Sequence, residues 1–352
     1  MITVAPSYDN CKIMGRHMFR NSVLYIDFSA SYVEFEFTGK KFSAVIRTDN
    51  AKGLEIFVAS VGVMINGKFE KRFALDEDVK EYVLFESETE EKVTIRLIKL
   101  CEAAFGKMGI ISFIHDGIMK PTAYKNKKIE FIGDSITCGY GIEAKNENEG
   151  FSTKIENPYL AYAVQTAESF DADFQLVSWS GNGIVSGSIP NDVDEASDSF
   201  LIPYVYQYTD AGGSSFAGDE EFEEWDFSKF QADIVVINLG TNDCTYTRGR
   251  EDRETAFEKL YIDFIDYIHK HQPKAEIICS LGVMGQELCH VIKRMVDKLS
   301  TTDKKVHYLE FEVQKAENGY GSDMHPSLAT HNLMMKALRE KIISLNITGY
   351  DK

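Results

Sequence analysis

The sequence predicts an α/β protein of two domains, in which an antiparallel β-sandwich of jelly-roll character precedes an α/β/α domain with a five-stranded parallel sheet. Three observations predict this fold class. The chain has 352 residues, which exceeds the usual size of a single hydrophobic core. Residues 1–122 alternate as half-buried strands do, and residues 123–352 alternate strand-like runs with helical ones. We therefore expect domains at 1–122 and 123–352.

A period of two residues dominates the first domain. Apolar residues alternate with polar ones over 32–37 and again over 93–97, which indicates strands with one buried face. The pair Asn66-Gly67 stands between two apolar runs and favours a type I′ hairpin, because both central residues of that turn need positive φ. No helical pattern interrupts this region, so an antiparallel sandwich is the expected architecture.

A polar and basic segment, residues 120–128, separates the two patterns and is the expected linker. Beyond it, apolar runs of strand length alternate with segments of helical spacing, as in a parallel sheet whose strands are connected by helices. The runs cover 129–132, 174–179, 234–239, 277–281 and 306–311. Because parallel strands end at one edge of their sheet, we expect the loops after them to form the active site.

Charge argues against a nucleic-acid partner. Lys and Arg number 38 against 55 Asp and Glu, for a formal charge of −17, whereas binding to a phosphate backbone needs an excess of cations. No apolar run has the length of a membrane span or of a signal-peptide core. We expect no membrane partner and a cytoplasmic location, or a secreted one if a leader has been trimmed.

Cysteine usage gives no sign of a metal centre. The six cysteines are scattered, without a C-x-x-C pair and without a grouping with histidine. Reduced thiols, no metal and no cofactor are therefore expected.

The predicted strand ends carry the residue types that acyl transfer requires. That reaction needs a nucleophile, a base for its proton and donors for the developing oxyanion. Ser135 follows the first strand of the parallel sheet, Gly181 the second and Asn242 the third, and His325 lies in a late loop. We expect Ser135 to be the nucleophile, His325 its base, and the Gly181 N–H and the Asn242 side chain the donors.

Four short motifs give the chain a family resemblance. Gly-Asp-Ser ending at Ser135, a glycine block around Gly181, Gly-Thr-Asn-Asp around Asn242 and the His-Pro pair at His325 resemble the four blocks of the SGNH (GDSL-type) hydrolase superfamily, over about 129–345. Asp134 and Asp243, inside these blocks, are expected to bond backbone groups and shape the loops. With the sandwich in front, the whole chain resembles carbohydrate esterase family 2.

This resemblance implies a fold and an activity. The fold is a jelly roll followed by a flavodoxin-like α/β/α domain. The activity is removal of acetyl groups from sugars by a serine esterase similar to acetyl xylan esterases, through an acetyl-serine intermediate and without a cofactor. In the implied site, Ser135 is the nucleophile, His325 is the base, and the Ser135 N–H forms the oxyanion hole with Gly181 and Asn242.

The acid that orients His325 departs from the superfamily pattern. The superfamily usually has Asp three residues before the histidine, and here that residue is Ser322. Asp323 lies two residues before the base, and in an extended segment such residues face the same side about 6.5–7 Å apart. We expect Asp323 to orient the imidazole. The alternative is a backbone carbonyl in that role, which makes the site a Ser-His dyad.

A long insertion, residues 184–230, separates the second and third motifs, and loops of this length tend to be functional. Its aromatic rings are candidates for a wall that stacks on sugar, although they could equally anchor a lid by packing. Residue 324 is Met where this esterase family often has Trp, which puts a stacking platform before the base in doubt. The candidate substrate-binding residues are Tyr204, Tyr206, Tyr208, Trp225, Tyr246 and Met324.

Two other functions fit the same motifs. A lipid or general short-acyl esterase uses the same four blocks, and a glycan-binding protein could retain a relic hydrolase site. The sandwich and the aromatic insertion favour an acetylated carbohydrate as the partner, and an intact set of Ser135, Gly181, Asn242 and His325 favours catalysis over binding alone. The sequence leaves open which sugar is deacetylated and at which hydroxyl. It also leaves open the oligomeric state of the protein.

Overall fold

The computed structural model describes residues 1–210 and 222–351, in two compact units. The first unit consists of Met1–Tyr124, Ser152–Lys154 and Thr209–Trp225. The second consists of Lys125–Phe151, Ile155–Tyr208 and Asp226–Lys352. The division at Tyr124 lies close to the expected boundary, but two later segments join the first unit, which the alternating patterns did not predict. Residues 211–221 of the expected insertion lie outside the described residues.

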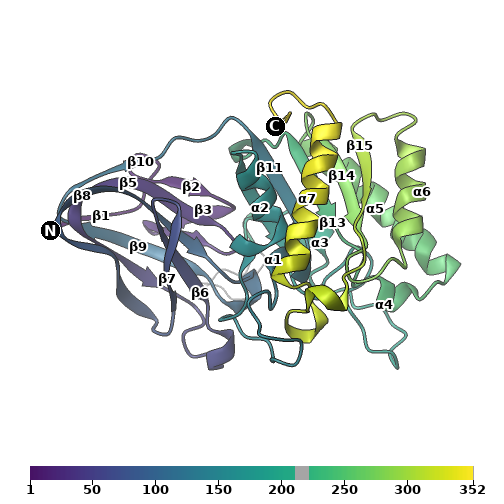
Figure 1. Ribbon diagram of the computed structural model, residues 1–352, viewed down its shortest axis with the longest axis horizontal. Coiled ribbons are helices and arrows are strands. Elements are labelled where there is room, and N and C mark those ends of the chain that lie inside the picture. The colour runs from purple at the N-terminus through teal and green to yellow at the C-terminus, as the bar shows by residue number, and fades with distance from the viewer. Residues whose placement is uncertain (211–221, 352) are drawn as a thin grey trace. The chain divides into compact units, whose positions relative to one another are not determined.

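The first unit is a curled antiparallel sheet (Figure 1). Its main order is β3-β4-β9-β5-β8-β6-β7, with β1 on β9 and with β2 and β10 on β5. The strands are β1 (Ile2–Val4), β2 (Lys12–Met14), β3 (His17–Arg20), β4 (Val23–Ile26), β5 (Tyr32–Arg47), β6 (Ser60–Ile65), β7 (Lys68–Ala74), β8 (Val79–Lys99), β9 (Met108–His115) and β10 (Ile118–Pro121). Register shifts where β5 pairs with β8 let these long strands bend, because a bulge increases local twist.

The apolar positions of the alternation form the core of this unit. Phe35, Phe37 and Phe42 are fully buried, and the rings of Phe35 and Phe42 stack with centroids 4.5 Å apart. The predicted hairpin joins β6 to β7, with positive φ at both Asn66 (51°) and Gly67 (77°). The period of two residues therefore identified the buried face, and the Asn66-Gly67 pair identified the turn.

A buried charge cluster connects the sheet to the segment Thr209–Trp225 of the same unit. The Lys107 Nζ lies 3.1 Å from the Asp210 carboxylate and 3.5 Å from that of Asp49, and the Lys107 side chain is 2% exposed. Burial lowers the pKa of Lys107, but the carboxylates of Asp27, Asp210 and Asp49 outweigh it, and the net effect is a raised pKa. Lys107 is therefore a buried cation held by several acids.

The second unit contains a five-stranded parallel sheet in the order β12-β11-β13-β14-β15 (Figure 1). The strands are β11 (Lys128–Gly133), β12 (Asp173–Ser178), β13 (Ile234–Asn238), β14 (Glu276–Leu281) and β15 (Val306–Glu310). All five occupy the apolar runs expected from the sequence. β11 and β13 are buried almost throughout, as strands covered on both faces must be.

Helices cover this sheet on both faces. They are α1 (Ser135–Cys138), α2 (Tyr162–Ser169), α3 (Ile202–Val205), α4 (Cys244–Thr247), α5 (Glu251–His271), α6 (Cys289–Leu299) and α7 (Leu328–Ser344). The chain crosses from β11 to β12 in one direction along the sheet and from β13 to β14 and β15 in the other, and right-handed crossovers in opposite directions place their helices on opposite faces. Accordingly α2, packed with α7, covers one face, and α5 and α6 cover the other. Among the described residues, no helix combines the length and the apolar character that a membrane crossing needs.

Candidate active site

Ser135 lies beyond the carboxyl end of β11, as the first residue of α1. The Asp134 side chain caps this helix by accepting the Ile136 N–H at 3.0 Å, which is the loop-shaping role expected for it. Gly133 permits the sharp turn from β11, because a Cβ there would collide with the Thr137 hydroxyl. The strand therefore delivers Ser135 to the rim of the sheet with its hydroxyl directed outward toward a partner.

That partner is His325. Its Nε2 lies 2.9 Å from the Ser135 Oγ, although the two residues are 190 positions apart in sequence. Its Nδ1 lies 3.1 Å from the Ser322 carbonyl oxygen, which can only accept a hydrogen bond. Nδ1 must therefore be protonated, and its N–H donates a hydrogen bond to the Ser322 carbonyl. Nε2 is then unprotonated and can accept the proton of Ser135. The structure thus brings together the expected nucleophile and base in the tautomer that catalysis needs.

Burial lowers the pKa of His325 below its ordinary value, because the protonated ring loses solvation. The hydrogen bond to the Ser322 backbone and the charge of Asp323 oppose this effect without overcoming it. The imidazole is therefore neutral at pH 7, which is the protonation state of a general base.

Asp323 does not take the position expected for an orienting acid. Its carboxylate accepts hydrogen bonds from the Tyr140 hydroxyl at 2.8 Å and from the Ser322 hydroxyl at 3.2 Å, and the imidazole Nδ1 faces the Ser322 carbonyl instead. The expectation assumed an extended segment. Asp323 and Met324 are instead both left-handed, with φ of 51° and 64°, and in this turn the Asp323 carboxylate bonds the Tyr140 hydroxyl and not the imidazole Nδ1. The geometry is that of the dyad alternative.

The expected oxyanion donors stand on both sides of the nucleophile. Gly181 follows β12 and Asn242 follows β13, and these strands flank β11, which leads to Ser135. The Asn242 Nδ2 donates to the Asp134 carboxylate at 3.2 Å and to the Asn182 carbonyl at 2.9 Å, so one amide ties the three loops together. To stabilise an oxyanion, Asn242 must redirect or share one of these N–H groups.

Asp243 shapes the loop after Gly181, as expected for it. Its buried carboxylate accepts hydrogen bonds from the backbone N–H groups of three consecutive residues, Ile184, Val185 and Ser186, at 2.7–3.1 Å. Burial raises the pKa of Asp243 to about 6, while the three N–H groups act in the opposite direction. The first residues of the insertion are therefore fixed to the loop that follows β13.

Two of the expected substrate-binding aromatics are structural instead. Tyr206 is fully buried, and its hydroxyl donates to the buried Glu130 carboxylate at 2.7 Å. Trp225 belongs to the first unit, where it is 4% exposed and the Arg16 guanidinium lies 5.4 Å from its ring. A buried ring offers no face to a sugar, so the prediction of a stacking role was wrong for both residues.

Tyr204 and Tyr208 lie in the second unit, with ring centroids 5.0 Å apart. Tyr204 is 43% exposed and lines a pocket of about 320 Å³ between α3 and α5, together with Leu260 and Tyr267. This pocket is lined by residues other than Ser135 and His325. Tyr204 is therefore placed in a pocket that neither member of the Ser135–His325 pair lines.

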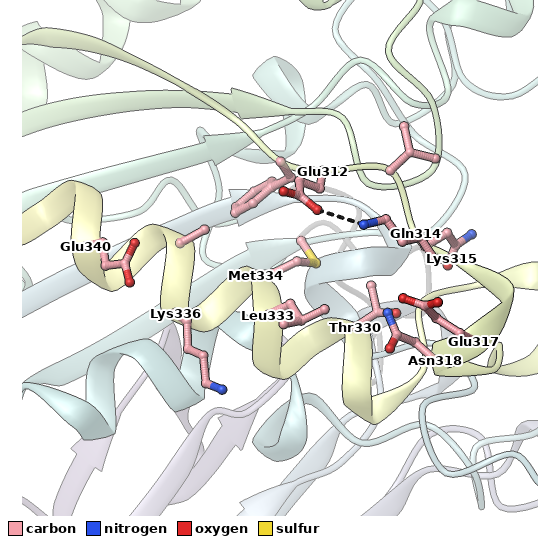
Figure 2. A pocket seen from close by; sticks show the side chains of 13 residues that line it. Glu312, Gln314, Lys315, Glu317, Asn318, Thr330, Leu333, Met334, Lys336 and Glu340 are labelled. Carbon is pink, nitrogen blue, oxygen red and sulfur yellow. Dashed lines mark hydrogen bonds and ion pairs between the residues drawn. The ribbon is translucent and has the colours of Figure 1, made fainter.

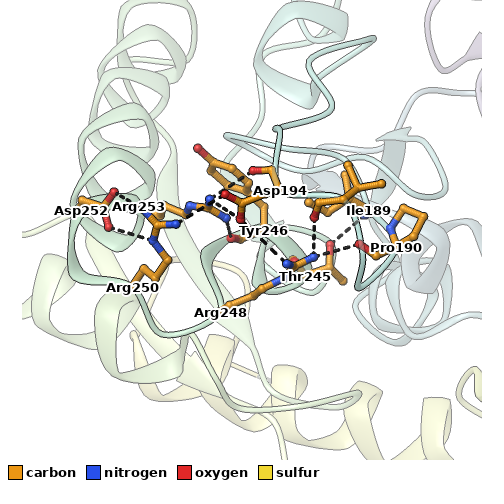
Figure 3. A network of polar contacts seen from close by, with 10 residues as sticks. Ile189, Pro190, Asp194, Thr245, Tyr246, Arg248, Arg250, Asp252 and Arg253 are labelled. Atoms are coloured by element: carbon orange, nitrogen blue, oxygen red, sulfur yellow. Dashed lines mark hydrogen bonds and ion pairs between the residues drawn. The ribbon is translucent and has the colours of Figure 1, made fainter.

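Tyr246 stands in a polar network that fastens the insertion (Figure 3). The Arg253 guanidinium lies 4.2 Å from the Tyr246 ring and donates to the Tyr246 carbonyl at 2.6 Å and to the Asp194 carboxylate at 2.6 Å. Arg248 donates to the carbonyls of Pro190 and Val193. The network therefore holds this part of the insertion against the helices that follow Asn242.

Met324 directly precedes the base and is 47% exposed. Its carbonyl accepts a hydrogen bond from the Gln314 side chain at 2.7 Å. Gln314 in turn lines a pocket of about 490 Å³ between residues 311–318 and α7, where Leu333 and Met334 form the opposite wall (Figure 2). The loop that carries the base is thus supported by a wall of this pocket.

Metal ligation finds no support in the part of the chain that the structure describes. There, no three side chains of His, Cys, Asp or Glu lie close enough together to hold a metal ion. None of the six cysteines, all of which lie in the described residues, forms a disulfide, and five of them are buried.

Two family models match the chain. The GDSL-like lipase/acylhydrolase family matches residues 131–333, and the N-terminal domain of carbohydrate esterase 2 matches residues 13–122. A cellulase/esterase, CelE, of Acetivibrio thermocellus is 32% identical over 324 residues, which are 89% of this chain and 37% of that protein. The chain thus spans about a third of that relative. An acetylxylan esterase/glucomannan deacetylase of Cellvibrio japonicus is 24% identical over 97% of this chain and 90% of its own length.

Solved structures resemble the chain along nearly its whole length. A family two carbohydrate esterase from Clostridium thermocellum, in complex with cellohexaose, is 30% identical with a TM-score of 0.85, and the match covers 97% of this chain and 99% of that one. An acetyl xylan esterase from the rumen bacterium Butyrivibrio proteoclasticus is 28% identical with a TM-score of 0.87, covering 99% and 97%. Both of the chain's units therefore have counterparts in these proteins.

Proposed function

Because the chain belongs to the GDSL-like lipase/acylhydrolase family and to carbohydrate esterase family 2, we propose that it removes O-acetyl groups from acetylated mono- or oligosaccharides. It is a carboxylic ester hydrolase. The observation that carries the proposal is the 2.9 Å contact between the Ser135 Oγ and the His325 Nε2. The acetylxylan esterase relatives supply the substrate class.

Acylation begins when neutral His325 accepts the proton of Ser135 as the Oγ attacks the acetyl carbonyl carbon. The carbonyl oxygen becomes an oxyanion, for which the N–H groups of Ser135 and Gly181 and the side chain of Asn242 are the proposed donors. The C–O bond to the sugar then breaks, and protonated His325 gives its proton to the departing sugar oxygen. The products of this half-reaction are a free sugar hydroxyl and acetyl-Ser135.

Deacylation repeats these steps with water as the nucleophile. His325 accepts a proton from water, the hydroxyl adds to the acetyl carbon, and the bond to the Ser135 Oγ breaks as that oxygen regains the proton. Acetate leaves and the site is restored. Throughout, the Nδ1–H group stays hydrogen-bonded to the Ser322 carbonyl oxygen. We therefore propose a Ser-His dyad in which a backbone oxygen fixes the tautomer of His325.

Substrate class is tested by acetate release from acetylated xylo-, manno- and gluco-oligosaccharides, measured beside p-nitrophenyl acetate and a long-acyl ester. We expect kcat/KM to be highest on an acetylated oligosaccharide. A preference for the long-acyl ester would replace this proposal with the lipid esterase alternative. Binding of the oligosaccharides without any acetate release would replace it with the relic-site alternative.

The first prediction concerns the nucleophile. Ser135→Ala should abolish acetate release on every substrate, because water alone then has to attack the ester, while the fold should persist since the change deletes a single oxygen atom that is hydrogen-bonded to His325. The circular dichroism spectrum and melting temperature serve as the control for folding. Wild-type acetate release by a folded Ser135→Ala protein would rule out the serine mechanism.

A further inference from the structure

Two aromatic rings stack next to the base. The Tyr140 ring stacks on the His325 imidazole, with centroids 4.1 Å apart and planes inclined by 29°. The Phe151 ring stacks on Tyr140 at 4.1 Å and 16°. Two rings cannot occupy the same face of a third at that separation, so Tyr140 lies between Phe151 and His325. Tyr140 follows Ser135 by five residues, in the turn that leaves α1.

The hydroxyl of Tyr140 holds the loop that carries the base. It donates to the Asp323 carboxylate at 2.8 Å, and the same carboxylate accepts the Ser322 hydroxyl at 3.2 Å. Ser322 is the residue whose carbonyl accepts the Nδ1 proton of His325. Through its ring and its hydroxyl, Tyr140 therefore touches both the imidazole and the peptide group that orients it.

The segment between Tyr140 and Phe151 fixes the same loop through its backbone. The Glu147 carbonyl accepts the Asp323 N–H at 3.1 Å, and the Glu149 carbonyl accepts the Ser322 hydroxyl at 2.6 Å. These contacts hold Ser322 and Asp323 in a turn whose φ at Asp323 is positive, a conformation that a residue other than glycine keeps only when its surroundings enforce it.

We propose that Tyr140 is a positioning residue for His325, and that it acts with Phe151 and Asp323 as a histidine clamp. A neutral carbonyl is a weaker acceptor than a carboxylate, so the Ser322 oxygen alone restrains the imidazole less than a triad acid would. The clamp supplies the missing restraint by fixing the plane of the ring and the position of its acceptor. This inference rests on the proposed function, since it assigns His325 the role of base.

The central comparison is between Tyr140→Phe and Tyr140→Ala. Phenylalanine keeps the stack and loses the hydrogen bond to Asp323, so we expect kcat to fall roughly threefold to tenfold. Alanine removes both, and a displaced base should lower kcat by about 10²-fold, as misplacement by about 1 Å can do. KM should stay within about threefold in both variants, because Tyr140 is assigned to the base and not to the sugar.

The pH profile of kcat/KM separates positioning from a general loss of folding. Tyr140→Ala lets water reach the imidazole, which raises its pKa toward the ordinary value, so the acid limb should move to higher pH. In Tyr140→Phe the phenylalanine still covers the His325 imidazole, so the acid limb of the profile should stay at its wild-type pH. If Tyr140 merely stabilised the fold, Tyr140→Ala would reduce the fraction of active enzyme, measured as the amplitude of the pre-steady-state burst. The acid limb and the kcat per active site would then stay unchanged.

Asp323 tests the shared tether. Asp323→Asn keeps an acceptor for the Tyr140 hydroxyl and should cost only a few-fold in kcat, whereas Asp323→Ala should match Tyr140→Phe. Asp323→Ala and Tyr140→Phe both remove the hydrogen bond between Tyr140 and Asp323, and Asp323→Ala also removes the 3.2 Å contact of the Ser322 hydroxyl, which keeps its 2.6 Å bond to the Glu149 carbonyl. The double variant should therefore be no slower than Asp323→Ala by more than about twofold. A loss of about 10⁴-fold in Asp323→Asn would instead make Asp323 the orienting acid and overturn the clamp.

The matched control is Tyr308→Phe, which deletes another hydrogen bond of 2.7 Å between a tyrosine and a carboxylate, that of Glu310 on β15. It should change neither kcat nor the acid limb. If Tyr140→Ala fails to fold, Tyr140→Leu keeps the apolar volume without an aromatic stack. Wild-type kcat and an unmoved limb in Tyr140→Ala or Tyr140→Leu would overturn the proposal. Every variant is also assayed on p-nitrophenyl acetate, which contains no sugar, so failure of the clamp is distinguishable from a wrong sugar assignment. Activity in Ser135→Ala would show that the serine mechanism itself is wrong.

Discussion

At the scale of single residues, reactivity depends on which protonation state each side chain holds. Burial keeps His325 neutral, so that it can act as a base. The hydroxyl of Ser135 lies within hydrogen-bond distance of that base. The proposed oxyanion donors differ from these two because they would act only when charge develops on the carbonyl oxygen. Their contribution is best measured as an effect on kcat.

The second prediction concerns the amide of Asn242. Asn242→Ala removes one side-chain donor from the oxyanion hole and should lower kcat by roughly 10²–10³-fold with a smaller change in KM. The same amide also bonds Asp134 and Asn182, so the melting temperature must be measured in parallel. An unchanged kcat in the folded variant would remove Asn242 from this role.

The third prediction is the pH dependence of catalysis. The base must be neutral, and burial lowers the pKa of His325 below its ordinary value of about 6.5. Activity should therefore be retained as the pH falls through 6.5 and be lost only below it, on the acid limb of a kcat/KM profile. An acid limb centred at or above 6.5 would contradict this assignment of the base.

Short motifs were sufficient to predict which residues lie together at this edge of the sheet, because Ser135, Gly181 and Asn242 each follow a strand that the apolar pattern identifies and His325 lies in the loop after the last one. Their catalytic roles remain predictions. Asp323 could not be placed this way, since its direction depends on a left-handed turn that no residue type in Ser322 to Met324 announces. Tyr140 was missed, although it stands between two glycines five residues after Ser135, and that pattern was the available signal.

At the scale of elements, one buried carboxylate organises the loop between β12 and the insertion. Asp243 accepts three backbone N–H groups of residues 184–186 and makes the start of that loop depend on the element after β13. Sequence patterns predicted the strands and the Asn66-Gly67 turn because their periodicity is local. They could not predict the path of the insertion, whose contacts join residues about 60 positions apart, as between Ile184 and Asp243.

The fourth prediction follows from that carboxylate. Asp243→Ala leaves three buried N–H groups without an acceptor, at about 1–3 kcal/mol each, and should lower the free energy of unfolding by about 3 kcal/mol or more. Asp243→Asn retains one acceptor oxygen and should lose less. Thermal or urea unfolding measures both. Asp226→Ala, which removes an exposed acceptor from the Ser228 N–H, is the matched control and should cost no more than about 2 kcal/mol.

At the scale of the whole molecule, neither unit is one continuous stretch of chain. The first unit takes in Ser152–Lys154 and Thr209–Trp225, and the Lys107 cluster depends on one of these returning segments through Asp210. Alternation along the first 122 residues could not reveal this, because it describes neighbours in sequence only. The cytoplasmic location remains a prediction, which cell fractionation would test.

The fifth prediction concerns the cation of that cluster. Lys107→Met leaves the carboxylates of Asp27, Asp49 and Asp210 without it, and removing one partner of a buried ion pair costs about 3–5 kcal/mol. Burial and the charge of Asp210 raise the pKa of Asp27, and loss of the Lys107 cation removes an opposing effect, so the deficit should be largest at neutral pH and shrink as the pH falls and Asp27 is protonated. Lys52→Met, at a side chain 89% exposed, is the control and should cost less than about 1 kcal/mol. Equal losses in both would contradict a buried role for Lys107.

The returning segment Thr209–Trp225 also sets an order of events during synthesis. A ribosome delivers the chain from its N-terminus at about 5–20 residues per second, so Trp225 emerges roughly 5–20 s after Tyr124. Until then the nascent sheet lacks Asp210 beside Lys107 and Trp225 beside Arg16. The first unit can complete these contacts only after residues beyond β12 have been translated, so its last contacts close a long loop and carry the entropy cost of that closure.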